Sequence, residues 1–190
     1  LQIDKRQYGN VKGASSSHYV IRLMHSLLSD LDKPDKFCSA VMYDFKKGFD
    51  LIDHTILIRK IHAMGLRSCY TRWLIAFLQN RRQRVRMPDG TTSSWRAITC
   101  GIPQGTLVGP VAFLAMINDA AAEEHRLKYV DDLTIYQSCP INTIEENWEM
   151  QASSDKLAEW ASQNKMSLNA DKCEVMYCYT AKKPVVLPDL

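Results

Sequence analysis

The sequence predicts an α+β domain in which antiparallel strands are backed by helices on one face. Two observations lead to this class. Segments with apolar residues at helical spacing alternate with short, densely apolar segments that are typical of strands. Turn residues separate several of the strand segments, and this pattern predicts hairpins. The expected order along the chain is helix, strand, helix, helix, hairpin, helix, hairpin, helix, strand.

The composition allows a substantial core and argues against several classes of protein. The 190 residues are 46% hydrophobic, and the formal net charge of +3 permits a polyanionic partner without requiring one. Six cysteines without a Cys-x-x-Cys pair argue against a zinc site or a disulfide framework, and they favour an intracellular protein. The absence of a long apolar run or a signal-peptide pattern predicts a protein that is neither membrane-bound nor secreted. Because the first residue is Leu1, we expect a piece of a longer chain.

The first predicted helix follows a polar, irregular segment at residues 1–13. Residues 15–17 are three serines, which favour a helix N-cap. The sequence Lys-Pro-Asp at 33–35 is expected to end the helix. Its apolar residues lie at helical spacing: Tyr19, Val20, Leu23, Leu27 and Leu28.

A buried central strand is predicted at residues 37–45, where apolar residues are dense and Asp44 comes near the end. Asp53 is a suitable N-cap for the next helix, which is expected to end at Gly65. The amphipathic face of that helix contains Ile56, Leu57, Lys60, Ile61 and Met64.

A second helix and a basic hairpin are predicted at residues 65–99. The hairpin would place Arg82, Arg84 and Arg86 on one face of its first strand. These arginines are either charges that guard a solvated edge strand or a strip that binds phosphates, and the sequence leaves both interpretations open. The preceding helix is expected to carry one apolar side: Tyr70, Trp73, Leu74, Phe77 and Leu78.

A glycine-punctuated loop at residues 100–105 precedes an apolar helix at 106–118. Gly101 and Gly105 allow close approach of the backbone, and Gln104 lies between them as a polar group on a rigid loop. The alternative is an ordinary turn before a core helix.

A strand, a sharp turn and a second strand are predicted around Tyr129, Val130, Asp131 and Asp132. Neighbouring side chains in a strand point to opposite faces, so both acids can serve one site only if the backbone turns there. Most such acid pairs are solvated hairpin tips.

The last part of the chain predicts a long helix at about 142–164, a turn at 168–172 and a strand at 173–179. Trp148 and Trp160 are interpreted as core residues of the helix and not as platforms for base stacking. Pro184 and Pro188 mark a loose tail.

Three carboxylates could meet at one edge of the predicted sheet: those of Asp44, Asp131 and Asp132. Such a cluster is destabilised by repulsion unless a cation binds, and oxygen-only ligands select magnesium or manganese. Two such ions form a clamp for in-line displacement at phosphorus. The alternative is that these acids pair with nearby lysines such as Lys46, Lys47 or Lys128.

Four segments in order resemble the palm motifs of reverse transcriptases, in the form found in non-LTR (LINE-type) retrotransposons. They are residues 44–50, 101–105, 129–132 and 168–172, supported by residues 7–9, 80–85 and 113–119. The resemblance covers nearly the whole chain. It implies a right-hand polymerase palm with part of the fingers, two Mg²⁺ (or Mn²⁺) ions, and an RNA template, a DNA primer and a dNTP as partners.

The resemblance also implies subdomain bounds. Residues 1–36 would be fingers-side, 37–64 the palm strand and helix, 65–99 fingers-side, 100–179 palm and 180–190 a tail. The family supplies more fingers before such a segment and a thumb after it. We therefore expect further domains in the same polyprotein, including a thumb and an endonuclease, and we expect the isolated segment to polymerise poorly.

The resemblance implies a role for each matching residue. Asp44, Asp131 and Asp132 match the catalytic, metal-binding acids, with the Phe45 carbonyl as a further ligand. Phe49 matches the ring that excludes a 2′-hydroxyl. Gln104 and Gly105 match positions that bind the incoming nucleotide, and Tyr129 and Val130 match positions beside the primer. Lys172 matches a lysine that protonates the departing pyrophosphate.

The expected contact with nucleic acid through Arg82, Arg84 and Arg86 rests on their positions in the predicted hairpin and not on the resemblance.

Two positions depart from the family pattern, because Gly48 and Val130 stand where relatives usually have alanine. The leading hypothesis remains template-directed nucleotidyl transfer. The alternative is a catalytically idle remnant that acts as a nucleic-acid-binding or interaction module. An RNA-copying RNA polymerase is disfavoured by Phe49.

Overall fold

The computed structural model describes residues 2–180 and 185–188, so Pro184 of the predicted tail lies outside the described residues. The chain divides into two compact units. The sheet unit comprises Asp4–Lys46 and Asp119–Leu190, and the helical unit comprises Leu1–Ile3 and Lys47–Asn118. The two units are defined by their compactness, and they do not test the expected division into fingers and palm. The bounds expected for those subdomains therefore remain a prediction.

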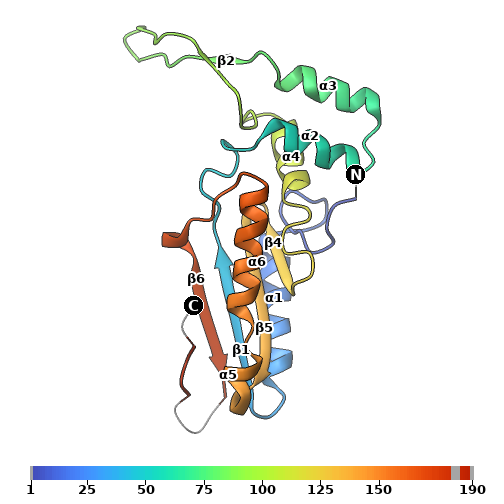
Figure 1. Cartoon of the computed structure of the whole chain (residues 1–190), viewed down its shortest axis with the longest axis vertical. Helices are drawn as coiled ribbons and strands as arrows, with labels where there is room; N and C mark the ends of the chain where they lie inside the picture. Colours follow the sequence, from blue (N-terminus) through green and yellow to red (C-terminus); the bar gives the residue numbers. More distant parts are fainter. Residues whose placement is uncertain (1, 181–184, 189–190) are drawn as a thin grey trace. The chain divides into compact units, whose positions relative to one another are not determined.

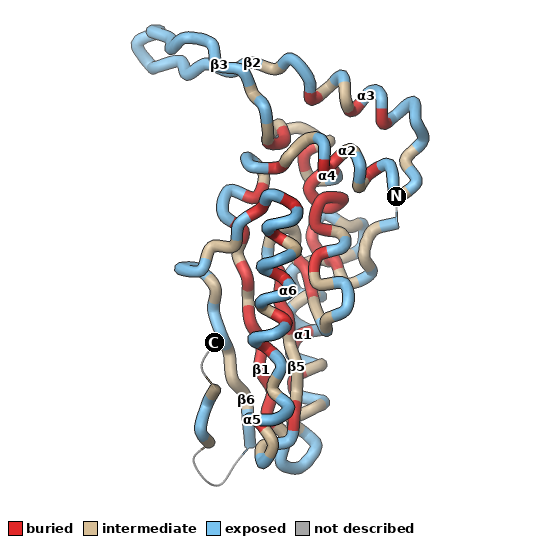
Figure 2. Tube along the Cα trace, viewed as in Figure 1, coloured by how far each residue is buried: buried red, intermediate tan, exposed pale blue. Residues whose placement is uncertain are grey.

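The sheet unit is built on a four-stranded antiparallel sheet in the order β4-β5-β1-β6 (Figure 1). The strands are β1 (Lys36–Tyr43), β4 (Arg126–Tyr129), β5 (Asp132–Pro140) and β6 (Glu174–Tyr179). The apolar run at 37–45 thus forms an interior strand, as the sequence predicts. Most residues of β1 are buried, including successive residues that point to opposite faces of the sheet (Figure 2). Both faces of the sheet are therefore covered.

The expectation that helices cover only one face is wrong. On one face, α1 (Ser16–Leu31) buries Leu23 and Leu27 against Cys38 of β1. On the other face, the Trp148 indole donates to Ser39 Oγ at 3.0 Å. Because Cys38 and Ser39 are adjacent in β1, they must point to opposite sides. Figure 1 shows α1 and α6 on either side of the sheet.

The helix α1 begins as predicted. Ser15 is its N-cap, and the Ser15 side chain accepts a hydrogen bond from the His18 backbone N–H. The apolar stripe is narrower than expected, however, because Val20 and Leu28 are exposed. Only one side of the helix packs against the sheet, and these two residues point away from it.

The long helix predicted at 142–164 is interrupted. The structure has η1 (Ile141–Thr143), α5 (Ile144–Asn147) and α6 (Met150–Gln163). At the break Trp148 is extended, with ψ 105°, and the Glu149 N–H donates to the Gln137 side chain. The Trp148 hydrogen bond to the sheet accompanies this change of direction. Trp148 and Trp160 are half-buried, and Trp160 donates to Asp119 Oδ1.

The helical unit contains α2 (His54–Ala63), α3 (Ser68–Leu78), α4 (Val108–Met116) and a hairpin formed by β2 (Arg82–Gln83) and β3 (Arg96–Ala97). Asp53 caps α2 as predicted, accepting from the N–H groups of Thr55 and Ile56. Helix α3 is less buried than expected. It turns Leu74 and Leu78 inward and leaves Tyr70 and Trp73 exposed.

The basic hairpin has less regular structure than its sequence suggests. Its ladder joins Arg82 to Ala97 and Gln83 to Arg96, and a single further bridge joins Arg86 to Thr92.

In the described part of the chain, no helix has both the length and the apolar character to cross a bilayer. All six cysteines lie among the described residues and are free thiols.

Candidate active site

The acidic pair lies at a tight turn between β4 and β5. Tyr129 pairs with Asp132, so Val130 and Asp131 form a two-residue hairpin turn. Val130 has φ 57°, in the left-handed region that a β-branched residue rarely adopts. The backbone therefore turns at the acidic pair, as a shared site requires.

The pairing of β1 with β5 brings Asp44 to the same end of the sheet. Tyr43 pairs with Leu133 in the antiparallel register. Asp44, which follows Tyr43, therefore lies at the same end of the sheet as Asp132, which precedes Leu133. Asp44 and Asp132 both line a pocket of about 530 Å³ in the sheet unit. The end of β1 and the start of β5 thus each contribute a carboxylate to one pocket.

The carboxylates repel one another. The pKa of Asp132 is raised, first by desolvation from neighbouring protein atoms and then by the negative charges of Asp131 and Asp44. Asp132 is nonetheless exposed and Asp131 half-buried, so solvent reaches both groups. A cation placed among them would relieve this repulsion.

The turn that precedes β6 holds Asp44 in place. The Asn169 side-chain Nδ2 donates to Asp44 Oδ2 at 3.1 Å, and the Asn169 backbone N–H donates to the Asp44 carbonyl at 2.8 Å. Lys172 places its Nζ 3.9 Å from Asp44 Oδ2, and its side chain is 69% exposed. Asn169 is a site residue that the sequence does not single out, because an asparagine in a turn is ordinary.

Two residues on the pocket wall also escape sequence reasoning. Tyr19 of α1 and Thr134 of β5 share a hydrogen bond between their hydroxyl groups, and both line the pocket. Burial raises the pKa of Tyr19, and the Asp132 charge adds to that shift. The Tyr19 ring also lies 6.0 Å, between centroids, from the ring of Tyr129. These contacts connect α1 to the hairpin that carries the acids.

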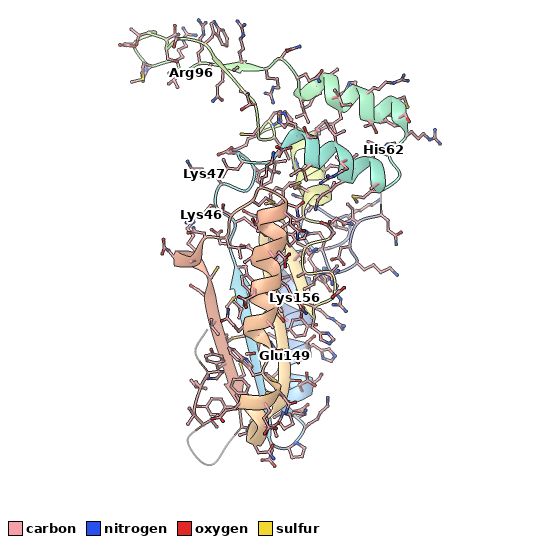
Figure 3. The ribbon with its side chains drawn as sticks, viewed as in Figure 1. Lys46, Lys47, His62, Arg96, Glu149 and Lys156 are labelled. Carbon is pink, nitrogen blue, oxygen red and sulfur yellow. The ribbon has the colours of Figure 1, made fainter. Side chains whose placement is uncertain are left out.

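Of the lysines near the acids, Lys172 approaches the triad, whereas Lys128 pairs with a different acid. Lys128 is buried, and it forms an ion pair with Asp4 at 3.2 Å. Lys172, in contrast, does approach Asp44. Lys46 and Lys47 are exposed on the loop after β1 (Figure 3). Asp4, an acid outside the predicted triad, is therefore a partner of Lys128.

The donor set fits a hard divalent cation. Asp44, Asp131 and Asp132 offer only oxygen atoms, which magnesium and manganese prefer. Among the described residues, no three Asp, Glu, His or Cys side chains are already arranged to hold a metal ion. A cation bound near Asp132 would relieve the repulsion that Asp131 and Asp44 exert on it.

The nucleotide-binding positions expected from the sequence fall in two places. Phe45 belongs to the sheet unit, where it is buried against Trp160 with 6.1 Å between ring centroids. In the helical unit, Phe49 stacks on Phe113 of α4, with 4.3 Å between centroids and 13° between planes. That packing fixes the orientation of the Phe49 ring.

The glycine loop docks on the segment around Phe49. The Gly101 N–H donates to the Ile52 carbonyl and the Ile102 N–H donates to the Phe49 carbonyl, each at 2.8 Å. Gly101 has φ 83°, and a Cβ there would lie 2.5 Å from the Asp50 carbonyl oxygen. Glycine is therefore required at this position. Gln104 is exposed and donates to Asp50 Oδ1 at 3.0 Å, while Gly105 is exposed beside it.

The basic hairpin presents its arginines to solvent. Arg82, Arg84 and Arg86 are all exposed, and the Arg84 guanidinium lies 4.6 Å from the centre of the Trp95 ring. Figure 3 shows Arg96 on the same hairpin. Exposed arginines with an aromatic side chain are compatible with nucleic-acid binding and equally with a solvated edge.

Comparison with known proteins assigns the family. The family described as "Reverse transcriptase (RNA-dependent DNA polymerase)" matches residues 2–186. The chain belongs to the reverse transcriptase family. The match spans both units and all four motifs.

Relatives of this reverse transcriptase chain come from mobile elements. It is 28% identical to a probable RNA-directed DNA polymerase from transposon BS of Drosophila melanogaster, over 96% of this chain and 21% of that protein. It is 26% identical to the RNA-directed DNA polymerase from mobile element jockey of Drosophila funebris, over 90% of this chain and 19% of that protein. The chain thus spans about a fifth of the length of these relatives.

Solved structures support the fold. A telomerase from Candida tropicalis, in complex with the TWJ fragment of telomeric RNA, matches with a TM-score of 0.67 and 11% identity, over 91% of this chain and 30% of that one. A telomerase from Candida albicans matches with a TM-score of 0.62 and 12% identity, over 90% and 32%. At these identities the likeness concerns the fold, which is the right-hand polymerase fold predicted from the motifs.

Proposed function

We propose that this chain forms the catalytic centre of an RNA-directed DNA polymerase that extends a DNA primer on an RNA template using dNTPs. The observation that supports this most is the convergence of Asp44 and Asp132 on one pocket, in a chain of the reverse transcriptase family. Template, primer and dNTP belong to the proposal, as do further domains such as a thumb and an endonuclease. An intracellular site of action is consistent with the free cysteines.

Asp44, Asp131 and Asp132, with the Phe45 carbonyl, would hold two Mg²⁺ or Mn²⁺ ions, which when bound lower the pKa of a primer 3′-hydroxyl and neutralise the leaving pyrophosphate. Asn169 restrains the Asp44 carboxylate by its 3.1 Å hydrogen bond. Such restraint fixes the geometry before substrate binds, and positioning of this kind lowers the barrier to displacement.

Lys172 is proposed to donate a proton to the departing pyrophosphate. Its Nζ is exposed and lies 3.9 Å from Asp44 Oδ2, so it can reach a group bound near that carboxylate. Tyr129 and Val130, next to the acids on the hairpin, are proposed to contact the primer end.

In the helical unit, Phe49 is proposed to exclude a 2′-hydroxyl. Its ring is held by stacking on Phe113, so it resists displacement by a ribose. Gln104 and Gly105 are proposed to contact the incoming nucleotide, and Arg82, Arg84 and Arg86 the phosphates of a nucleic-acid strand.

Primer extension by the full-length parent protein tests the proposal. Asp131→Ala is expected to abolish extension, because the metal site loses one of its carboxylates. Asp155→Ala provides a matched control, since Asp155 is an exposed acid of α6, on the opposite side of the sheet from α1. Extension by Asp131→Ala at the wild-type rate would refute the assignment. Salt-dependent binding to an RNA–DNA hybrid without extension by the wild type would indicate a binding module instead.

A further inference from the structure

The turn that carries Asp131 has a backbone conformation that its own sequence does not favour. Two-residue hairpin turns with a positive φ at the first position strongly prefer glycine there. This turn has Val130, with φ 57°. A β-branched residue in that region is strained, and such strain persists only where surrounding contacts enforce it.

The side chain of Gln7 supplies those contacts. Gln7 Oε1 accepts a hydrogen bond from the Val130 N–H at 3.0 Å, and Gln7 Nε2 donates to the Val130 carbonyl at 3.4 Å. One amide group thus engages both backbone polar groups of the strained residue. The same Oε1 accepts from the Gly9 N–H at 2.8 Å. Gln7 is only 4% exposed, so water competes little for these bonds.

The segment that carries Gln7 is itself fixed to the edge of β4. The Tyr8 N–H donates to the Lys128 carbonyl at 2.8 Å, and the Lys128 N–H donates to the Arg6 carbonyl at 2.9 Å. Asp4 adds ion pairs to Arg126 at 2.8 Å and to Lys128 at 3.2 Å. These contacts hold the Gln7 side chain against the turn.

Gly9 allows the close approach that this arrangement needs. A Cβ on Gly9 would lie 2.5 Å from the Val130 backbone nitrogen and would overlap the Val130 side chain. Any larger residue at position 9 would push the segment away from the turn. Gly9 and Gln7 therefore act on the same residue, one by making room and one by hydrogen bonding.

We propose that Gln7 is a positioning residue that holds the Val130–Asp131 turn in the conformation that presents Asp131 next to Asp132. The idea rests on the proposed function, because it gives Gln7 a role in assembling the metal-binding carboxylates. Gln7 itself touches no reacting group, and it acts through the backbone of Val130.

The test uses this chain and two readouts. Hydrogen exchange of the Val130 amide, followed by NMR, reports on the hydrogen bond between that amide and Gln7. Mn²⁺ titration, followed by paramagnetic broadening at the three aspartates, reports on the metal site. The variants are Gln7→Ala, Gln7→Ala with Val130→Gly, and the control Gln151→Ala, which removes an exposed glutamine from α6.

Gln7→Ala is expected to speed Val130 amide exchange and to weaken Mn²⁺ binding about tenfold, the size of effect seen when groups behind metal ligands are removed. Adding Val130→Gly is expected to restore Mn²⁺ binding, because glycine adopts positive φ without strain. A purely structural defect would not be repaired in this way. Gln7→Met keeps most of the buried side-chain volume and removes both hydrogen bonds to Val130, so it serves if Gln7→Ala does not fold.

Unchanged exchange of the Val130 amide in Gln7→Ala would overturn the inference. Faster exchange with unchanged Mn²⁺ affinity would overturn it as well. So would a failure of Val130→Gly to restore Mn²⁺ binding in the double variant. If wild-type protein binds no Mn²⁺ at these acids, the proposed function fails. The exchange rate of the Val130 amide still decides whether Gln7 bonds to the turn in solution.

Discussion

Replacing the buried Lys128 with methionine is expected to change how the stability of the fold depends on pH. Burial, the largest cause, lowers the pKa of Lys128 from 10.5 to about 8, against the opposing attraction of Asp4. Between these two pH values the unfolded chain holds a proton on Lys128 that the folded chain has lost. The stability of the wild type therefore rises with pH across this window as far as Lys128 is concerned.

The magnitude follows from the size of the shift. A change from 10.5 to about 8 corresponds to about 3 kcal/mol of unfolding free energy. The pKa of Tyr43, which burial raises to about 12, acts in the opposite direction, because the unfolded state loses that proton first. Tyr43 is present in both proteins, so its contribution cancels when the variant is subtracted from the wild type.

Lys128→Met is a clean perturbation because Asp4 keeps a second partner. Arg126 Nη2 lies 2.8 Å from Asp4 Oδ2, so the variant does not leave a buried carboxylate unpaired. Urea unfolding followed by circular dichroism, at several pH values from below 8 up to 10.5, measures both proteins in the window that the shift defines. The wild type is expected to gain about 3 kcal/mol relative to the variant as the pH rises. A constant difference, or one that falls as the pH rises, would refute the reasoning.

Three further predictions concern the site. Asp132→Asn is expected to raise the free energy of unfolding without divalent ions by on the order of 0.5 kcal/mol, a small gain because the carboxylate is exposed and screened, and so to raise the melting temperature; a lower melting temperature would contradict the repulsion. Asn169→Ala is expected to weaken Mn²⁺ binding about tenfold by calorimetry, whereas Asn147→Ala, which changes an exposed asparagine of α5, should not; equal affinities in both would remove the role of Asn169. Gly101→Ala is expected to destabilise the fold by about 3 kcal/mol in urea unfolding, and more than Gly65→Ala, where φ is 85° but nothing lies within 4 Å; equal losses would show that strain alone decides.

The elements with strong local signals were predictable from the sequence. A dense apolar run before Asp44 becomes β1, and Ser15 and Asp53 cap their helices. Each of these depends on a few neighbouring residues, so a short stretch of sequence contains the information.

Features that depend on distant partners were not predictable. Helical periodicity does not say which side of a sheet a helix covers, so the coverage of both faces was missed. The break at Trp148 accompanies a hydrogen bond to Ser39, which lies in another element. Local propensity does not include such tertiary contacts.

The same difference between local signals and distant contacts applies to the residues of the site. The acids were found because adjacent carboxylates in a turn are visible in the sequence. The roles of Asn169 and Gln7 were missed, although both lie in segments that carry the family resemblance, because each acts on a residue more than a hundred positions away, as the separations of 125 and 123 show. Gln7 also lies in a polar, irregular segment, where a glutamine normally needs no explanation.

The measurement that tests the central claim most directly is a crystal structure of this chain grown with Mn²⁺, with the metal located by anomalous scattering. The account predicts an anomalous peak within about 2.5 Å of carboxylate oxygens from both Asp44 and Asp132. Manganese bound elsewhere, or carboxylates of Asp44 and Asp132 that share no ion, would contradict it.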